Sequence, residues 1–179
     1  MIKKVICKIV FINFIFSQGA WMVSNRTHPE LEWETIKTQN FNVHFHNGLY
    51  DIALKGANIA EKIRETLMDQ VGLDSLQKLD IVFTTEDEIS NGFATPANYT
   101  VIWLDVNEMA IWAEGEKWLN IVLAHELQHL VYFNVTKTWL PTPMSQLYSG
   151  VPGWVVEGMA EYFTAVSYTH LTLPTILLV

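Results

Sequence analysis

Residues 125–129 constrain this chain more than any other segment, because they read His-Glu-Leu-Gln-His inside a strongly apolar run (118–133). Such a run is typical of a helix buried beneath a cleft. Residues four apart on a helix lie one turn above each other on the same face, so His125 and His129 should project together. Imidazoles at this spacing can reach one zinc ion, with Glu126 beside the open coordination position as a potential general base.

A second segment, residues 153–162, also predicts a helix and carries two glutamates four residues apart. Catalytic zinc sites often use two histidines and one glutamate and leave one position for water. Glu157 is the natural third ligand. Glu161 lies one turn further on, where its carboxylate can accept a hydrogen bond from the free ring N–H of His125 and fix the orientation of that ring.

Two other interpretations of these segments do not involve a metal. The first helix can be an amphipathic core helix whose histidines are satisfied by hydrogen bonds, and the glutamates of the second can form a solvated face. The sequence speaks against a solvated face, because Glu157 has the apolar neighbours Trp154, Val155 and Met159. These neighbours predict a buried environment, in which a charged group needs a partner.

The His-Glu-x-x-His motif followed by Trp-x-x-Glu-Gly-x-Ala-Glu-Tyr resembles the gluzincin zinc metallopeptidases, the superfamily of thermolysin-like and aminopeptidase-like enzymes. The resemblance implies zinc bound by His125, His129 and Glu157, with Glu126 as the catalytic base and Glu161 as the carboxylate behind the ligands. It implies an α+β, zincin-like fold, in which a small mixed β-sheet packs on helices and the motif helix precedes a glutamate-bearing helix. The implied function is zinc-dependent hydrolysis of peptide bonds in a peptide or protein substrate.

Residues 41–164 further resemble the peptidase-like domain that precedes a β-propeller in some large secreted bacterial proteins, which implies a propeller in the full-length protein. Because the spacing from His129 to Glu157 exceeds that in thermolysin, a thermolysin-type substrate preference is not implied. Two alternatives remain open: a catalytically inactive zinc-binding or scaffold domain of such a protein, and hydrolysis of a non-peptide amide.

The first residues of the chain combine a basic start, a short apolar core and small residues at Ser17 and Gly19. This pattern predicts a secretory signal peptide over residues 1–19 and a secreted or periplasmic mature chain. The apolar core is too short to span a membrane comfortably, so we expect no membrane span in the mature chain. The alternative is a buried strand.

Removal of the predicted signal peptide would change the chemistry of the chain in two ways. Three lysines leave, so the formal charge moves from −8 to −11, and the only cysteine, Cys7, leaves as well. The mature chain would then have no disulfide, and its acidity argues against nucleic acid or an anionic membrane as a partner.

At the other end, residues 166–179 resemble the translation of an adapter sequence used in preparing sequencing libraries. We therefore expect a non-native tail there, and a metallopeptidase domain over residues 20–165 that the natural gene continues. The alternative is a genuine β-strand tail.

Between the ends, alternating and periodic apolar residues predict the order β-β-α-β-β-α-α. The strands are a hairpin about Gln39-Asn40, then 78–83 and 99–105, and the first helix covers 51–71 with Gly72 as its stop. Strand 99–105 is expected at the sheet edge beside the cleft, where free backbone groups would bind an extended peptide.

Some segments carry weaker signals. Residues 86–96 read as a polar, turn-rich stretch, with a solvated helix start favoured over a calcium site at 86–88 and with 92–96 on the rim of the cleft. His44 and His46 share one strand face and are expected to face solvent. The candidates for a donor to the oxyanion are Tyr148 and Tyr162, each also consistent with simple packing.

Overall fold

The structure is a computed structural model that describes residues 30–85, 90–104, 115–137 and 151–172. The chain divides into residues 1–31 and residues 32–179. All the described helices and strands lie in the second unit. In chain order they are β1 (Trp33–Lys37), β2 (Phe41–His46), α2 (Tyr50–Val71), β3 (Leu79–Thr84), β4 (Asn91–Thr95), β5 (Tyr99–Trp103), α4 (Gly115–Val135) and α6 (Gly153–Thr172).

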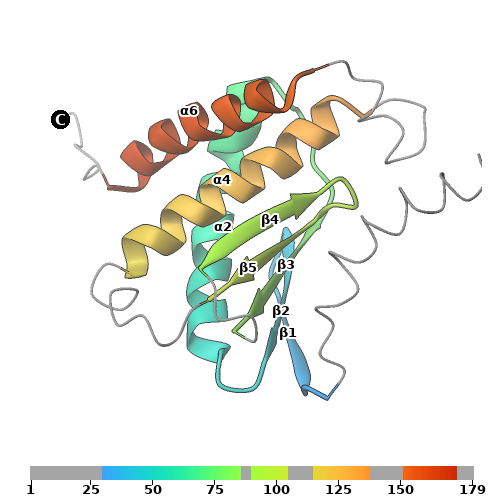
Figure 1. The fold of residues 1–179 in the computed structure, drawn as a ribbon, viewed down its shortest axis with the longest axis vertical. Coiled ribbons are helices and arrows are strands. Elements are labelled where there is room, and N and C mark those ends of the chain that lie inside the picture. The colour runs from blue at the N-terminus through green and yellow to red at the C-terminus, as the bar shows by residue number, and fades with distance from the viewer. Residues whose placement is uncertain (1–29, 86–89, 105–114, 138–150, 173–179) are drawn as a thin grey trace, which may run out of the picture. The chain divides into compact units, whose positions relative to one another are not determined.

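The strands form one mixed sheet in the order β1-β2-β3-β5-β4 (Figure 1). β2, β3 and β5 run parallel to one another, while β1 and β4 pair antiparallel at the two edges. Parallel neighbours need a crossover connection, and α2 supplies it between β2 and β3. The prediction of a small mixed sheet in an α+β fold is confirmed.

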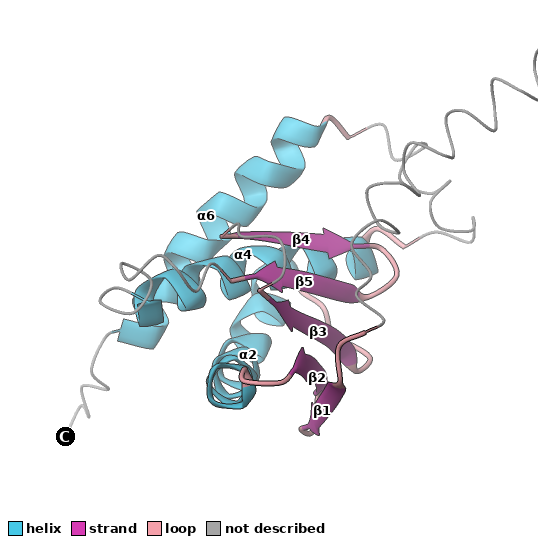
Figure 2. Ribbon diagram, turned by 60° about the horizontal axis from the view of Figure 1, so that its bottom comes forward, coloured by secondary structure: helices cyan, strands magenta, loops and turns pink. Residues whose placement is uncertain are grey.

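The helices gather on one face of the sheet (Figure 2). α2 packs on β2, α4 packs on β4 and β5, and α6 packs on α4 and α2. The core lies between the sheet and the helices α2 and α4. Alternate side chains of each strand point toward these helices and fill this space. The largest members of the core include Phe41, Phe45, Ile81 and Phe83 from the strands, and Leu119, Leu123, Leu127 and Leu130 from α4.

The end of α2 confirms the predicted stop at Gly72. This residue adopts the left-handed conformation (φ 67°) that glycine tolerates, and its N–H donates to the Asp69 carbonyl. The N–H of Leu73 donates to the Met68 carbonyl at 3.0 Å. The carbonyls of Met68 and Asp69 in the last turn are therefore satisfied by backbone donors.

The predicted hairpin is also confirmed, since β1 and β2 pair antiparallel around residues 38–40. Its turn is held by Glu61 of α2, whose carboxylate accepts hydrogen bonds from the Asn40 backbone N–H at 2.8 Å and the Asn40 side-chain amide at 2.7 Å. Burial acts to raise the pKa of Glu61. The hydrogen bonds from Asn40 and Thr38 and the charge of Arg64 outweigh it and lower the pKa below its ordinary value of 4.5.

We expect Glu61→Gln to lower the free energy of unfolding by about 1 to 2 kcal/mol, because an amide cannot satisfy both Asn40 donors. A depressed carboxyl pKa stabilises the fold at higher pH, and that contribution is lost as the pH falls through the folded-state pKa. The difference between wild type and variant should therefore shrink on acidification below pH 4.5. Urea denaturation at several pH values measures this difference in the free energy of unfolding, and Glu65→Gln, at an exposed position, is the control. A difference that does not change with pH would contradict the role given to the Glu61 carboxylate.

Two predictions about the edge of the sheet opposite β1 are wrong. The turn-rich interpretation of residues 86–96 misses β4, and strand 99–105 does not form the edge, since β5 lies between β3 and β4. Asn91, Gly92 and Ala94 have low strand propensity, so pairing with β5 rather than local preference makes this segment a strand. A turn over residues 96–98, with Asn98 at φ 67°, closes the hairpin. The acidic residues 86–88 lie outside the described part of the chain.

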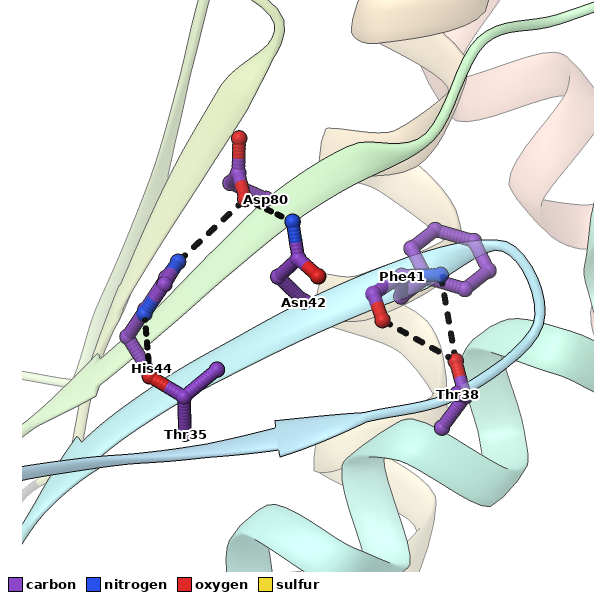
Figure 3. Close-up of polar contacts among 6 residues, drawn as sticks. All are labelled: Thr35, Thr38, Phe41, Asn42, His44 and Asp80. Atoms are coloured by element: carbon purple, nitrogen blue, oxygen red, sulfur yellow. Dashed lines mark hydrogen bonds and ion pairs between the residues drawn. The ribbon is translucent and has the colours of Figure 1, made fainter.

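The prediction that His44 and His46 face solvent is wrong for His46, whereas the His44 side chain remains 35% exposed although it has polar partners. Figure 3 shows the His44 ring between Thr35 Oγ1, 2.9 Å from Nδ1, and Asp80 Oδ1, 3.2 Å from Nε2. His46 is only 5% exposed and lies edge-to-face against Trp33. Neighbouring strands supply these partners, and Asp80 is 36 residues from His44 along the chain.

At the C-terminal end, α6 continues through Thr172, so the β-strand alternative for residues 166–172 is wrong. The adapter origin of this segment stays a prediction. The predicted signal peptide and Tyr148 lie outside the described residues. Within the described part of the chain, no helix is both long enough and apolar enough to cross a membrane.

Candidate metal centre

α4 carries both histidines of the motif on one face. Its leucines face the core and are at most 2% exposed, which fixes the rotation of the helix about its axis. The side chains of His125 and His129 are 18% and 9% exposed, and their ring centroids lie 4.8 Å apart. The ring of Phe133, one turn further on, stacks on His129.

α6 brings the two glutamates to these rings. The helix runs opposite to α4 (Figure 1). Glu157 lies next to both His125 and His129, and Glu161, one turn further along α6, lies next to His125. Ala160, just before Glu161, is only 1% exposed, so this side of α6 is packed against the rest of the fold.

Three ligand atoms form a nearly equilateral triangle. The Nε2 atoms of His125 and His129 are 3.1 Å apart, and Glu157 Oε2 lies 3.3 Å from the first and 3.4 Å from the second. A tetrahedral zinc with bonds of about 2.0 to 2.1 Å separates its ligands by about 3.3 to 3.4 Å. The three donors therefore have the element types and the spacing that zinc requires.

The environment of His129 also suits a metal ligand. Burial lowers the pKa of His129 below its ordinary value of 6.5, and neighbouring His125 adds to this, although the Glu157 carboxylate opposes it. A neutral imidazole is the form that binds metal ions. Burial therefore favours the neutral form of His129.

Glu161 lies on the opposite side of the His125 ring from the ligand triangle. Its Oε1 is 3.6 Å from Nδ1 of His125, an ion-pair distance slightly too long for a hydrogen bond. The carboxylate thus lies by the ring nitrogen at which a metal-bound histidine usually meets its supporting group.

Glu126 is buried beside the triangle, at 6% exposure. Burial and the nearby charge of Glu157 raise the pKa of Glu126 to about 7. A hydrogen bond from the Ala94 backbone lowers the pKa, but it does not offset these two effects. The carboxyl group also rests on Gly92, whose lack of a side chain leaves room for it. Strand β4 therefore forms one wall of the site.

The expected burial of Glu157 is wrong. Its side chain is 65% exposed and Trp154 is 77% exposed, because the outer side of α6 is not covered by the described residues. The histidines are sheltered while the carboxylate is open to solvent, so the triangle lies at an accessible surface. Tyr162, a candidate for the oxyanion donor that is also consistent with simple packing, is 67% exposed and packs its ring on Phe163.

The sequence interpretation placed residues 92–96 on the rim of the cleft, but it missed the contact of Gly92 and Ala94 with Glu126 because it treated their segment as a turn-rich stretch. One signal was available: a glycine inside a strand often marks a close approach of another group.

The chain matches no family model and no curated protein. The function is therefore inferred from the motif and the geometry of the site.

Proposed function

We propose that this chain is a secreted or periplasmic zinc metallopeptidase of the gluzincin type, which hydrolyses peptide bonds. The observation that carries the proposal is the triangle of His125 Nε2, His129 Nε2 and Glu157 Oε2, with sides of 3.1 to 3.4 Å, beside the buried Glu126. These residues come from two separate helices, and their convergence is hard to explain by core packing alone.

The donor set favours a catalytic over a structural zinc site. Among the described residues, the group able to hold a metal has three members, two imidazoles and one carboxylate. Structural zinc sites are usually closed by four protein ligands, whereas catalytic sites use three and leave one position for water. The 65% exposure of the Glu157 side chain supports a site that a substrate could reach.

When bound, zinc supplies a water molecule of lowered pKa and polarises the scissile carbonyl. Glu126 is the group placed to accept the proton of the attacking water at its carboxylate and to donate it to the leaving nitrogen. Glu161 supports the His125 ring from behind.

β4 takes the role that strand 99–105 was expected to have. It is an edge strand that lies against Glu126, and no other described strand pairs with its outer side. This supports β4 as the strand that would bind an extended peptide beside the base.

The proposal is tested by incubating the zinc-loaded protein with a broad peptide library and identifying the cleavage products by mass spectrometry. We expect cleavage that stops when a chelator removes the metal and returns when zinc is restored. A zinc-loaded protein that cleaves no peptide would contradict the proposal and favour the scaffold alternative.

A further inference from the structure

The contact between β4 and Glu126 is unusually close. A Cβ atom built on Gly92 would lie 2.5 Å from Cγ, 2.6 Å from Oε1 and 2.7 Å from Cδ of Glu126. The backbone of Gly92 has no left-handed φ that would require glycine. Position 92 therefore needs glycine for its missing side chain, because the Glu126 side chain occupies the space that a Cβ atom would fill.

The same strand also binds the carboxylate. The backbone of Ala94, two residues beyond Gly92, makes a hydrogen bond to Glu126. The β4–β5 turn is fastened to the same helix, because the Asn134 side-chain amide donates to Asn98 Oδ1 at 2.7 Å. β4 is thus held against α4 at its turn and at Glu126, and cannot easily move away to admit a larger side chain.

We infer that Gly92 is a positioning residue for the general base: its missing side chain lets the Glu126 carboxylate lie on β4, hydrogen-bonded to Ala94 and beside the ligand triangle. This inference rests on the proposed function. A methyl group at residue 92 is most cheaply accommodated by rotation of the Glu126 side chain. That rotation moves the carboxylate away from its working position.

Gly56 of α2 provides a matched control. A Cβ atom there would lie 2.5 Å from Cζ and 2.8 Å from Cε2 of Phe83, an equally severe overlap. Phe83 is fully buried in the core, where its ring has no free space into which to rotate. The two glycines therefore separate the effects: Gly56→Ala strains the core, and Gly92→Ala displaces the base.

The test compares Gly92→Ala, Gly56→Ala and wild type by kcat, KM, zinc affinity and melting temperature. For Gly92→Ala we expect kcat to fall about 100-fold, the loss expected when a catalytic group is misplaced by about 1 Å. Its KM and zinc affinity should stay within about threefold of wild type, since the zinc ligands and the rest of the substrate-binding surface are unaltered. Gly56→Ala should melt at a lower temperature but keep its kcat under conditions where it is folded. A Gly92→Ala variant with wild-type kcat would overturn the inference.

A second readout separates this inference from the proposed function. The backbone amide resonance of Ala94 reports the hydrogen bond to Glu126 whether or not the protein cleaves peptides. Gly92→Ala should shift this resonance in the same direction as Glu126→Ala, and Gly56→Ala should leave it in place. If wild type proves inactive, the proposed function fails, and an unshifted Ala94 amide in Gly92→Ala would then overturn the positioning role as well.

Discussion

Replacing Glu126 with glutamine is expected to lower kcat by roughly 10³- to 10⁴-fold, the upper range for loss of a general base, while zinc stays bound. Glutamine has the same shape and can still accept the hydrogen bond that Ala94 makes to Glu126. It cannot take a proton from water. The variant therefore removes the proton transfer and leaves the packing on Gly92 intact.

The measurement is kcat on a peptide that the wild type cleaves, together with zinc content by elemental analysis. Glu65→Gln, an exposed glutamate on α2, makes the same chemical change away from the site and should keep wild-type activity. If Glu126→Gln cleaves the peptide as fast as wild type with zinc bound, the proposed mechanism is ruled out.

Removing one of the proposed zinc ligands should have an equally large effect, through metal binding rather than proton transfer. We expect His129→Ala to bind zinc more than about 100-fold more weakly, a larger loss than removing a supporting group behind a ligand causes. Zinc at 100 times its dissociation constant stabilises the folded state by about 2.7 kcal/mol. Wild type should therefore melt at a higher temperature with zinc, and His129→Ala should lose this shift.

His44→Ala is the matched control for this experiment. It also removes a histidine that lies near a carboxylate, but His44 belongs to the pair with Asp80 on β2 and β3. The control should keep the zinc-dependent rise in melting temperature. An equal loss of the shift in both variants would mean that the zinc effect does not come from the motif helix.

Features that depend on local pattern were predictable from the sequence. The apolar run around the motif predicted α4, the stop at Gly72 predicted the end of α2, and alternation predicted the β1–β2 hairpin. The spacing of four also predicted that His125 and His129 would share one face, because helical geometry alone fixes this.

Features that depend on contacts distant in the sequence were not predictable. β4 is a strand because β5 pairs with it, and the meeting of His44 with Asp80 depends on strand order. The exposure of Glu157 depends on what packs over α6, which no local pattern reveals. The gluzincin relationship, the signal peptide and the propeller stay predictions from the sequence.

The claim on which the proposed function depends is that one zinc ion binds to side chains from both α4 and α6. A crystal structure of the zinc-loaded protein, with anomalous data at the zinc edge, measures this directly. The expected result is a single peak about 2.0 to 2.2 Å from Nε2 of His125, Nε2 of His129 and a carboxylate oxygen of Glu157. A peak elsewhere, or a zinc ion bound by the histidines with Glu157 turned away, would contradict the account.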